Sequence, residues 1–351
     1  MMRLCLVIIF TALLFFPGSR ATAASDWESV VFIYHRFDEA RYPSTNISID
    51  DFSAHLAILK AEQIQVLRLI DLAEAMASGK PLPARSVVLT VDDAFTSFLT
   101  GAWPLLREAG FPVTLFVNTG SVGRPGYLDW AQLRSLEAAG VDIANHTVSH
   151  AHLINRLEGE SPADWRQRVV GEVTEAGEAL EQHLERPVNL FAYPYGEYEP
   201  ELLKIMQEAG FLAAMAQQSG VVTAAADRFA LPRFPMGGVY AGPEGFREKL
   251  TMRRLPLEVL SPASPLVSGE SIPELVVEVG DGVIRSDQLR CYVLGQPAGE
   301  ITPLKGVPGR YRVKGTSPIR SRRGKYTLTA PGLHGGWYWF SQPWFNPALP
   351  E

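Results

Sequence analysis

Two neighbouring carboxylates directly follow an apolar run of the sequence. Asp92 and Asp93 come after residues 86–91, which are rich in β-branched side chains and predict a buried strand. Carboxylates in such a place can supply a general base, a metal ligand or both. The structural alternative is an aspartate that caps a helix beside a solvated neighbour.

A pair of histidines follows another apolar run. His146 and His150 stand after residues 141–144, about fifty positions beyond the carboxylates. Their spacing lets both imidazoles face the same side of a tight loop or helical turn, as binding of a divalent metal demands. A Pro-Tyr-Gly motif at 194–196 predicts a third feature, a turn at the end of the run 188–192, although an ordinary strand exit has the same pattern.

Short apolar runs alternate with amphipathic stretches over the first two thirds of the chain. The expected strands are 30–34, 65–69, 86–91, 113–117, 141–144 and 188–192, and the expected helices include 52–61, 130–139 and 164–184. This alternation predicts a barrel-like α/β domain, residues 24–257, whose parallel sheet is covered on both faces. Ligands bind at the carboxyl ends of the strands in such folds, where all three motifs stand.

The pattern changes after residue 257. Strand-like runs separated by Gly, Pro and Asp turns occupy 274–279, 288–294, 309–313, 325–329 and 336–341, after a linker-like segment at 262–265. They predict an all-β, sandwich-like accessory domain at 258–351. The aromatic run 337–345 contains three tryptophans, which either form a platform for sugars or pack in the core.

Composition narrows the class of protein. The chain has 351 residues, 46% of them hydrophobic, and 32 basic against 38 acidic side chains give a net charge of −6. These values exclude a disordered chain and argue against nucleic acid or an anionic membrane as the partner. A small molecule or a polysaccharide is favoured instead as the partner. The composition gives no prediction, for or against, about protein partners.

The first residues have the pattern of a cleavable secretory signal. Arg3 precedes an apolar run at 4–16, and small residues follow at 21–24. We expect removal of residues 1–23, no transmembrane span in the mature chain, and a secreted, periplasmic or extracellular location. The alternative is a permanent membrane anchor, although the run is short for crossing about 30 Å of hydrocarbon.

In this order the three motifs resemble the polysaccharide deacetylases of the NodB homology type, carbohydrate esterase family 4. The resemblance covers residues 30–236, and the segment 34–52 is similar to the branch that acts on poly-N-acetylglucosamine. It implies a distorted (β/α) barrel and a metal-dependent hydrolase that removes N-acetyl groups from an N-acetylhexosamine polysaccharide. The implied cofactor is a divalent metal, with Zn²⁺ the first candidate, and the implied partner is the acetylated polysaccharide.

The resemblance also implies roles for individual residues. It makes Asp93, His146 and His150 the metal ligands, Asp92 the general base, and the main-chain N–H of Tyr195 a donor to the oxyanion. Two rival functions remain open. Paired carboxylates also occur in glycosidases, although adjacent aspartates diverge and do not flank a bond at about 5–9 Å. A non-catalytic polysaccharide-binding protein is the second rival.

The chain departs from the family pattern at two places. The usual arginine before the Pro-Tyr-Gly motif is Ala192, and the usual Leu-x-His that supplies the general acid is absent. The first predicted strand ends in Tyr34-His35. It has the form of the family's strand that carries the missing histidine. We therefore expect a circular permutation in which His35 is the acid, and Arg233 replaces the arginine. Two other histidines, His55 and His183, are expected on the surface.

Overall fold

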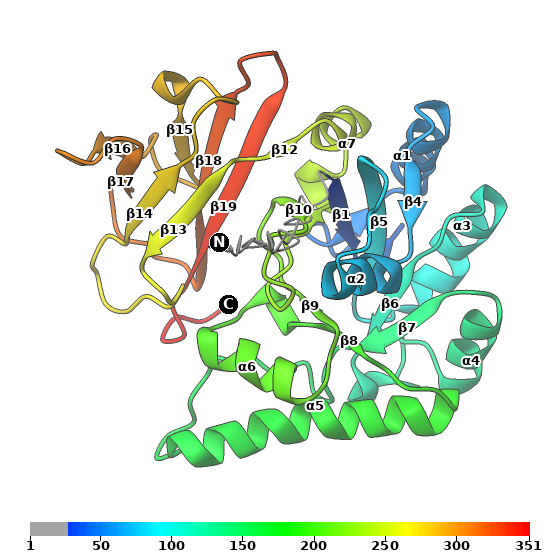
Figure 1. Ribbon diagram of the computed structural model, residues 1–351. Coiled ribbons are helices and arrows are strands. Elements are labelled where there is room, and N and C mark those ends of the chain that lie inside the picture. Colours follow the sequence, from blue (N-terminus) through cyan, green and yellow to red (C-terminus); the bar gives the residue numbers. More distant parts are fainter. Residues whose placement is uncertain (1–26) are drawn as a thin grey trace, which may run out of the picture.

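The computed structural model describes residues 27–351, which form the two regions seen in Figure 1. The α/β region runs from residue 28 to residue 250, and the β-rich region from 253 to 345. The predicted signal peptide, 1–23, lies outside the described residues. Within the described part of the chain, none of the helices combines the length and the apolarity needed to cross a membrane.

One nine-stranded sheet organises the α/β region. Its strand order is β10-β1-β5-β6-β7-β8-β9, with β11 added beside β1 and β4 beside β5. All these pairings are parallel except that of β10 with β1. The sheet curls into a half-barrel (Figure 1), and the predicted α/β barrel is confirmed. The strands are β1 (Glu28–Tyr34), β4 (Gln65–Leu67), β5 (Arg85–Val91), β6 (Thr114–Val117), β7 (Asp142–Asn145), β8 (Leu190–Ala192), β9 (Ala213–Met215), β10 (Val221–Thr223) and β11 (Phe234–Pro235). A separate small pair joins β2 (Arg36–Phe37) to β3 (Asn46–Ile47).

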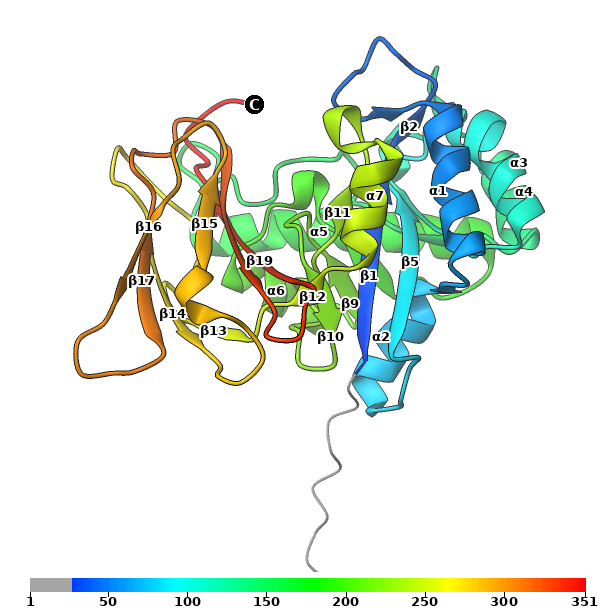
Figure 2. The same ribbon diagram turned by 90° about the horizontal axis from the view of Figure 1, so that it is seen from above.

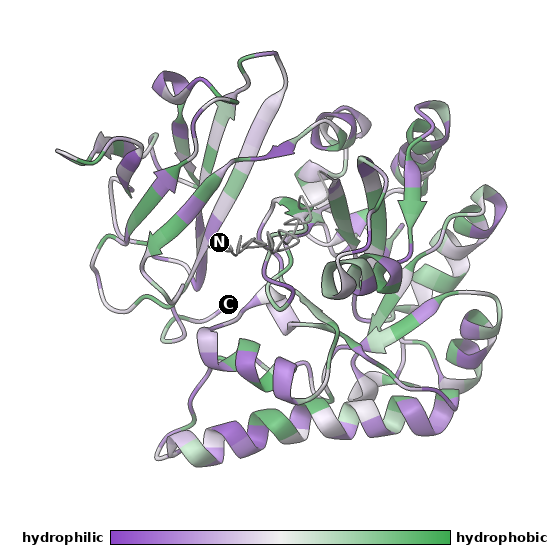
Figure 3. Ribbon diagram, viewed as in Figure 1, coloured by the Kyte–Doolittle hydropathy of each residue, from purple (hydrophilic) through white to green (hydrophobic). Residues whose placement is uncertain are grey.

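Seven helices cover the sheet in the described chain. They are α1 (Ile49–Ala61), α2 (Leu69–Ser78), α3 (Trp103–Ala109), α4 (Trp130–Ala138), α5 (Pro162–Leu184), α6 (Pro200–Glu208) and α7 (Pro243–Leu250). The longest, α5, begins at a capping serine, Ser161, and buries one apolar stripe, so hydrophobic and hydrophilic residues alternate along it in Figure 3. Asp129 accepts a hydrogen bond from the Gln132 main chain and caps α4, which begins where the helix predicted over 130–139 begins.

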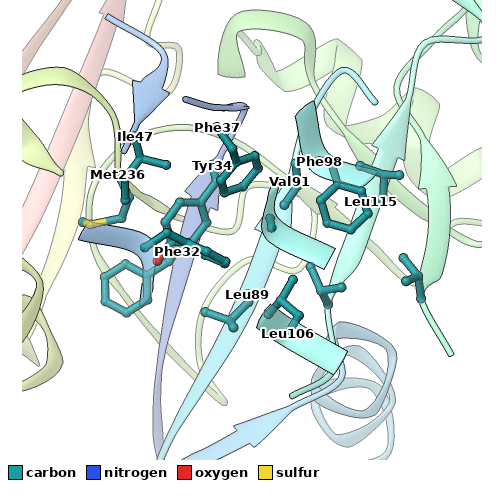
Figure 4. Packing of buried hydrophobic residues seen from close by; sticks show 14 of the residues in the cluster. Phe32, Tyr34, Phe37, Ile47, Leu89, Val91, Phe98, Leu106, Leu115 and Met236 are labelled. Atoms are coloured by element: carbon teal, nitrogen blue, oxygen red, sulfur yellow. The ribbon is translucent and has the colours of Figure 1, made fainter. Parts of the chain in front are cut away.

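Strands β1 and β5 are adjacent interior strands of the sheet, and their side chains contribute to the core that also contains residues of α1 and α3. Phe32, Tyr34, Leu89 and Val91 are nearly inaccessible and pack together in Figure 4. His55 of α1 also lies in this core, where it stacks on Phe246 with 4.0 Å between ring centroids. The expectation that His55 is a surface residue is therefore wrong.

The β-rich region consists of two four-stranded sheets that face each other. One has the order β12-β19-β18-β15 and the other β13-β14-β17-β16. Leu275 and Val277 of the second sheet pack with Cys291 and Leu328 of the first, so the predicted all-β sandwich is confirmed and Cys291 is a buried core residue. The strands are β12 (Arg253–Arg254), β13 (Leu257–Ser261), β14 (Glu274–Val279), β15 (Arg290–Val293), β16 (Glu300–Pro303), β17 (Arg310–Lys314), β18 (Arg323–Pro331) and β19 (Trp337–Phe345).

The two regions meet along β19, which lies between the rest of the β-rich region and the half-barrel in Figure 2. Trp339 packs edge-on against Phe234, with 5.6 Å between centroids, and its indole N–H donates to the main-chain oxygen of Ser219 at 3.1 Å. Phe345 joins the α/β core beside Tyr198. Strand β13 comes before the predicted linker at 262–265, so the change of architecture precedes that segment. The proposed division into separate domains, 24–257 and 258–351, stays a prediction.

Candidate active site

Parallel strands bring the separate sequence motifs to one edge of the sheet. Tyr34 at the end of β1 pairs with Val91 at the end of β5, so His35 and Asp92 follow neighbouring strands side by side. Strand β7 ends at Asn145, directly before His146, and it pairs with β8, which leads into Tyr195. The carboxyl edge of the half-barrel therefore collects all the candidate residues of these motifs.

Asp93, His146 and His150 offer three ligand atoms that lie within 4.8 Å of one another. Asp93 Oδ1 is 3.2 Å from His150 Nε2 and 3.6 Å from His146 Nε2. His146 Nδ1 lies 2.8 Å from the main-chain oxygen of Ala192, which can only accept, so Nδ1 carries the proton and the Nε2 lone pair faces the carboxylate. One carboxylate and two imidazoles in this arrangement fit a divalent transition metal.

The loop that carries the histidines is held by hydrogen bonds to its neighbours. Asn145 donates to the main-chain oxygen of Val173 in α5 and accepts from the Thr147 main chain at 2.8 Å. Glu172 of α5 accepts from the main-chain N–H groups of Val148 and Ser149. These bonds hold the loop in one conformation.

Asp92 is buried and faces Arg233 in a two-point ion pair. Arg233 donates from Nη1 to one carboxylate oxygen at 2.7 Å and from Nη2 to the other at 2.8 Å. Burial by itself raises the pKa of Asp92, but the opposing charge of Arg233, with smaller effects of His146 and hydrogen bonding, lowers it to about 2. Asp92 is therefore an anion at neutral pH.

Arg233 itself is fully buried and held on several sides. Its Nε donates to the main-chain oxygen of Ala216 at 2.9 Å, and Nη1 also approaches the Thr90 hydroxyl at 3.3 Å. It lies directly before β11, which runs parallel to β1. The sequence hypothesis placed Arg233 beside the base, and the contacts agree with that position; its role stays a prediction.

Burial is the main cause of the pKa shifts of the three candidate metal ligands. It raises the pKa of Asp93 to about 6, and it lowers the pKa of His146 to about 3. The pKa of His150 is lowered for the same reason. Neutral imidazoles are the form that a metal binds, so the site favours the ligand state of both histidines before any ion arrives.

His35 belongs to the same cluster of charges. Burial lowers its pKa, and the charges of Asp92 and Asp93 oppose this shift because both are close to the ring. The net direction favours the neutral imidazole, so the ring has to take up a proton before it can act as an acid. The structure thus places His35 at the site, and its function as an acid stays a prediction.

Strained backbone is concentrated in the three motifs. In residues 27–351, eight residues other than glycine have positive φ, and five of them lie in these motifs: Asp93, Ala94, Thr147, His150 and Tyr195. Such conformations cost energy and persist where the surroundings hold them, most often at functional sites. The strain at the carboxylate, histidine and Pro-Tyr-Gly motifs is therefore a second, independent sign that this edge is functional.

The Pro194–Gly196 turn is rigid and tightly packed. Gly196 has φ +69, and a Cβ there would lie 2.5 Å from the main-chain nitrogen of Gln217. Tyr195, with φ 60, stacks on His152 at 3.8 Å and meets the edge of His150 at 4.5 Å. The turn is thus wedged between the histidine loop and Gln217.

A second polar cluster lies behind Tyr195 and was missed by sequence reasoning. His152 Nδ1 lies 2.8 Å from Glu197, and Arg322 of the β-rich region donates to both oxygens of the same buried carboxylate. His152, Glu197 and Glu351 also satisfy the distances of a possible metal site. The sequence signals were the position of His152 two residues after His150 and that of Glu197 directly after the Pro-Tyr-Gly motif.

A carboxylate anion beside three possible metal donors is an arrangement that suits metal-assisted hydrolysis. Residues 79–214 match the family model described as polysaccharide deacetylase. This matched segment is therefore similar to polysaccharide deacetylases, and the resemblance inferred from the motifs is confirmed. The matched segment includes Asp92, Asp93, His146, His150 and Tyr195 but neither His35 nor Arg233.

Similar proteins carry the same description. The poly-beta-1,6-N-acetyl-D-glucosamine N-deacetylase of Escherichia coli (strain K12) is 26% identical over 203 residues, covering 48% of this chain but only 30% of the relative. The enzyme of the same name from Staphylococcus aureus (strain MRSA252) is 22% identical over 208 residues, covering 58% and 71%. The structure of Streptococcus pyogenes deacetylase PplD in complex with acetate aligns with a TM-score of 0.58 and 21% identity, over 64% of this chain and 99% of that one, which shows a shared fold.

Proposed function

We propose that the chain is a deacetylase of a poly-N-acetylglucosamine-like polysaccharide, acting by hydrolysis of the N-acetyl group. The observation that carries this proposal is the pairing of the Asp92 anion with Arg233 directly beside the three donors Asp93, His146 and His150. The names of the relatives in Escherichia coli and Staphylococcus aureus support the choice of polymer. The signal-like pattern of residues 1–23 supports action outside the cytoplasm.

Asp93, His146 and His150 would hold the metal, and two imidazoles with one carboxylate suit Zn²⁺. A bound divalent ion polarises an acetyl carbonyl and makes a water molecule more acidic. The protein's own contribution is preorganisation. The hydrogen bond from His146 to Ala192 and the anchoring of the loop by Glu172 orient the ligand atoms in advance.

Asp92 is the proposed general base. Arg233 holds both oxygens of its carboxylate and keeps it ionised, so that it can accept a proton from the attacking water. Because Arg233 is itself tied to Ala216, the carboxylate has little freedom to turn away. Arg233, held by its contact with Ala216, is thus the proposed residue that orients the catalytic base.

Tyr195 and His35 complete the proposed machinery. The main-chain N–H of Tyr195, in the strained turn, is the proposed donor to the oxyanion of the tetrahedral intermediate. His35, which adjoins Asp92 across β1 and β5, is the proposed donor of the proton that the leaving amine needs. Together these groups serve the two sides of the scissile C–N bond.

The test is release of acetate from an N-acetylglucosamine oligomer by the full chain. We expect release by the wild type, loss of release with a chelator, and a fall of about 100-fold or more for Asp92→Asn, because removal of the general base costs about that much. Asp281→Asn, a change at an exposed aspartate of the β-rich region, is the matched control and should behave as wild type.

Two results would contradict the proposal. Cleavage that creates new reducing ends and ignores chelator would indicate a glycosidase. Binding of the oligomer without any product, on every acetylated glycan offered, would indicate a non-catalytic polysaccharide-binding protein.

A further inference from the structure

A groove leads away from the candidate site along the seam between the two regions. Its first part, about 300 Å³, is lined by Tyr195, Tyr240, Leu294 and Lys325, among other residues. The adjoining part, about 600 Å³, shares the last three of these side chains and adds an aromatic wall. Tyr195 therefore connects the groove to His150 and the candidate metal donors.

Exposed aromatic side chains gather in this groove. Four aromatic residues are strongly exposed in residues 27–351, and three of them, Tyr240, Tyr292 and Trp337, line the second part of the groove. Between 46% and 56% of each of these three side chains is accessible. Exposed aromatic residues clustered around one hollow indicate a binding surface and are not explained by core packing.

The alternation of side chains along β15 and β18, which belong to one sheet, explains why these aromatic side chains face outward. On β15, Cys291 and Val293 point into the sandwich core, so Tyr292 between them points out. On β18, Tyr326 and Leu328 point inward, which leaves Lys325, Thr327 and Thr329 on the groove side. The groove lining thus combines Lys325 and two largely buried threonines with aromatic rings.

We infer that this groove binds the sugar units of the polysaccharide that adjoin the unit being deacetylated. The inference rests on the proposed function and adds the path of the polymer. A pyranose ring has an apolar C–H face and a polar rim, which match aromatic rings and hydroxyl groups respectively. The charged residues in the second part are one of each sign, Glu248 and Lys325, which suits an uncharged, acetylated polymer.

The sequence left two roles open for the tryptophans of the run 337–345, a platform for sugars or packing in the core. The structure indicates different roles for different tryptophans. Trp344 is buried against Tyr326 and Trp339 packs on Phe234, so both have structural roles. Trp337 is 49% exposed and lines the groove. The platform function belongs to Trp337 of β19 together with Tyr292 of β15, which lies beyond β18 in the same sheet.

The experiment measures binding and turnover separately. Tyr292→Ala and Trp337→Ala are made in the full chain, with Leu260→Ala as control because Leu260 is exposed on the other sheet. Binding of an N-acetylglucosamine hexamer and dimer is measured by calorimetry, and acetate release from both is measured in parallel. We expect hexamer affinity to fall about tenfold or more in each groove variant, which corresponds to about 1.4 kcal/mol of binding free energy. Acetate release from the hexamer should fall more than release from the dimer, because the dimer is the shorter ligand.

Unchanged hexamer affinity in both groove variants would overturn the inference, whatever the enzymatic activity. If the wild type releases no acetate but loses hexamer affinity on these substitutions, the groove stands as a glycan site and the proposed deacetylation fails. The two proposals therefore fail on different readouts.

Discussion

Arg322 of the β-rich region and Glu197 of the α/β region form a two-point ion pair although 125 residues separate them. The two hydrogen bonds measure 2.7 and 2.8 Å, and both side chains are buried. Glu197 also holds His152, which stacks on Tyr195. The β-rich region thus supports the turn that contains the proposed oxyanion donor.

Replacement of Arg322 by methionine should destabilise the whole protein. It would leave the Glu197 carboxylate buried without its partner, at a cost of about 3–5 kcal/mol in the free energy of unfolding. Urea unfolding followed by fluorescence checks this value. The double variant Arg322→Met, Glu197→Gln should regain part of the loss, and Arg320→Met, an exposed arginine nearby, should match wild type. Equal stability of wild type and Arg322→Met would contradict the structural role.

Arg233→Lys should lower turnover and leave metal binding intact. Lysine keeps the charge but cannot hold both oxygens of Asp92 in a fixed plane, so the base loses its orientation. We expect kcat to fall about 100-fold, the usual effect of a small misplacement of a reacting group. Metal content measured by mass spectrometry should equal that of the wild type. Arg247→Lys, on the exposed face of α7, is the control, and a wild-type kcat for Arg233→Lys would show that the pair has no catalytic role.

His35→Gln tests the permuted acid. If His35 protonates the leaving amine, kcat should fall about 100-fold while KM changes little, because the lost interaction acts in the transition state. The comparison is with His334→Gln, at an exposed histidine of the β-rich region. Near-full turnover by His35→Gln would refute the acid hypothesis and leave Asp92 and the metal donors unaffected.

Metal removal should abolish activity reversibly. We expect about one divalent ion per chain after dialysis of the wild type, and a large loss of bound metal in His150→Ala, because three protein ligands are the usual minimum of a catalytic site. Retention of metal by His150→Ala would point away from this triad. His152→Ala distinguishes the second cluster, since loss of metal from that variant alone would locate the ion beside Glu197.

His55 predicts a pH dependence of stability. Burial lowers the pKa of His55 in the folded chain to about 4, against 6.5 when the chain is unfolded. Between these values only the unfolded chain takes up the proton, so the free energy of unfolding should decrease as the pH falls from 6.5 to 4, by up to about 3 kcal/mol. His55→Gln should lose this part of the slope in urea unfolding at several pH values. A slope identical to that of the wild type would contradict the assignment.

The sequence predicted the candidate site well where a functional residue directly follows a strand in the chain. Asp92, His146 and Tyr195 each follow a strand within a few residues, so alternation of apolar runs was enough to predict that they meet. The pair of Arg233 with Asp92 spans 141 residues and was expected only from a missing family residue. Arg322 had no such signal, because nothing local shows that β19 and its neighbours pack on the half-barrel.

The prediction that His55 lies on the surface failed for a related reason. Helical periodicity places it on α1 but does not say which face the core occupies, and the aromatic partner that covers it, Phe246, belongs to α7. Its hydrogen bond to Tyr34, 3.1 Å, is likewise made between elements. A polar residue is assigned to the surface by default, and only tertiary packing reveals the exception.

The order in which the chain is synthesised gives the link between Arg322 and Glu197 a further meaning. A ribosome completes the aspartate and histidine motifs long before it reaches Arg233, and it adds Arg322 and Trp339 later still. Until then the reactive side chains exist without the groups that orient them. The growing polypeptide is therefore expected to be inert, and catalytic competence should arise late, as a property of the nearly finished molecule.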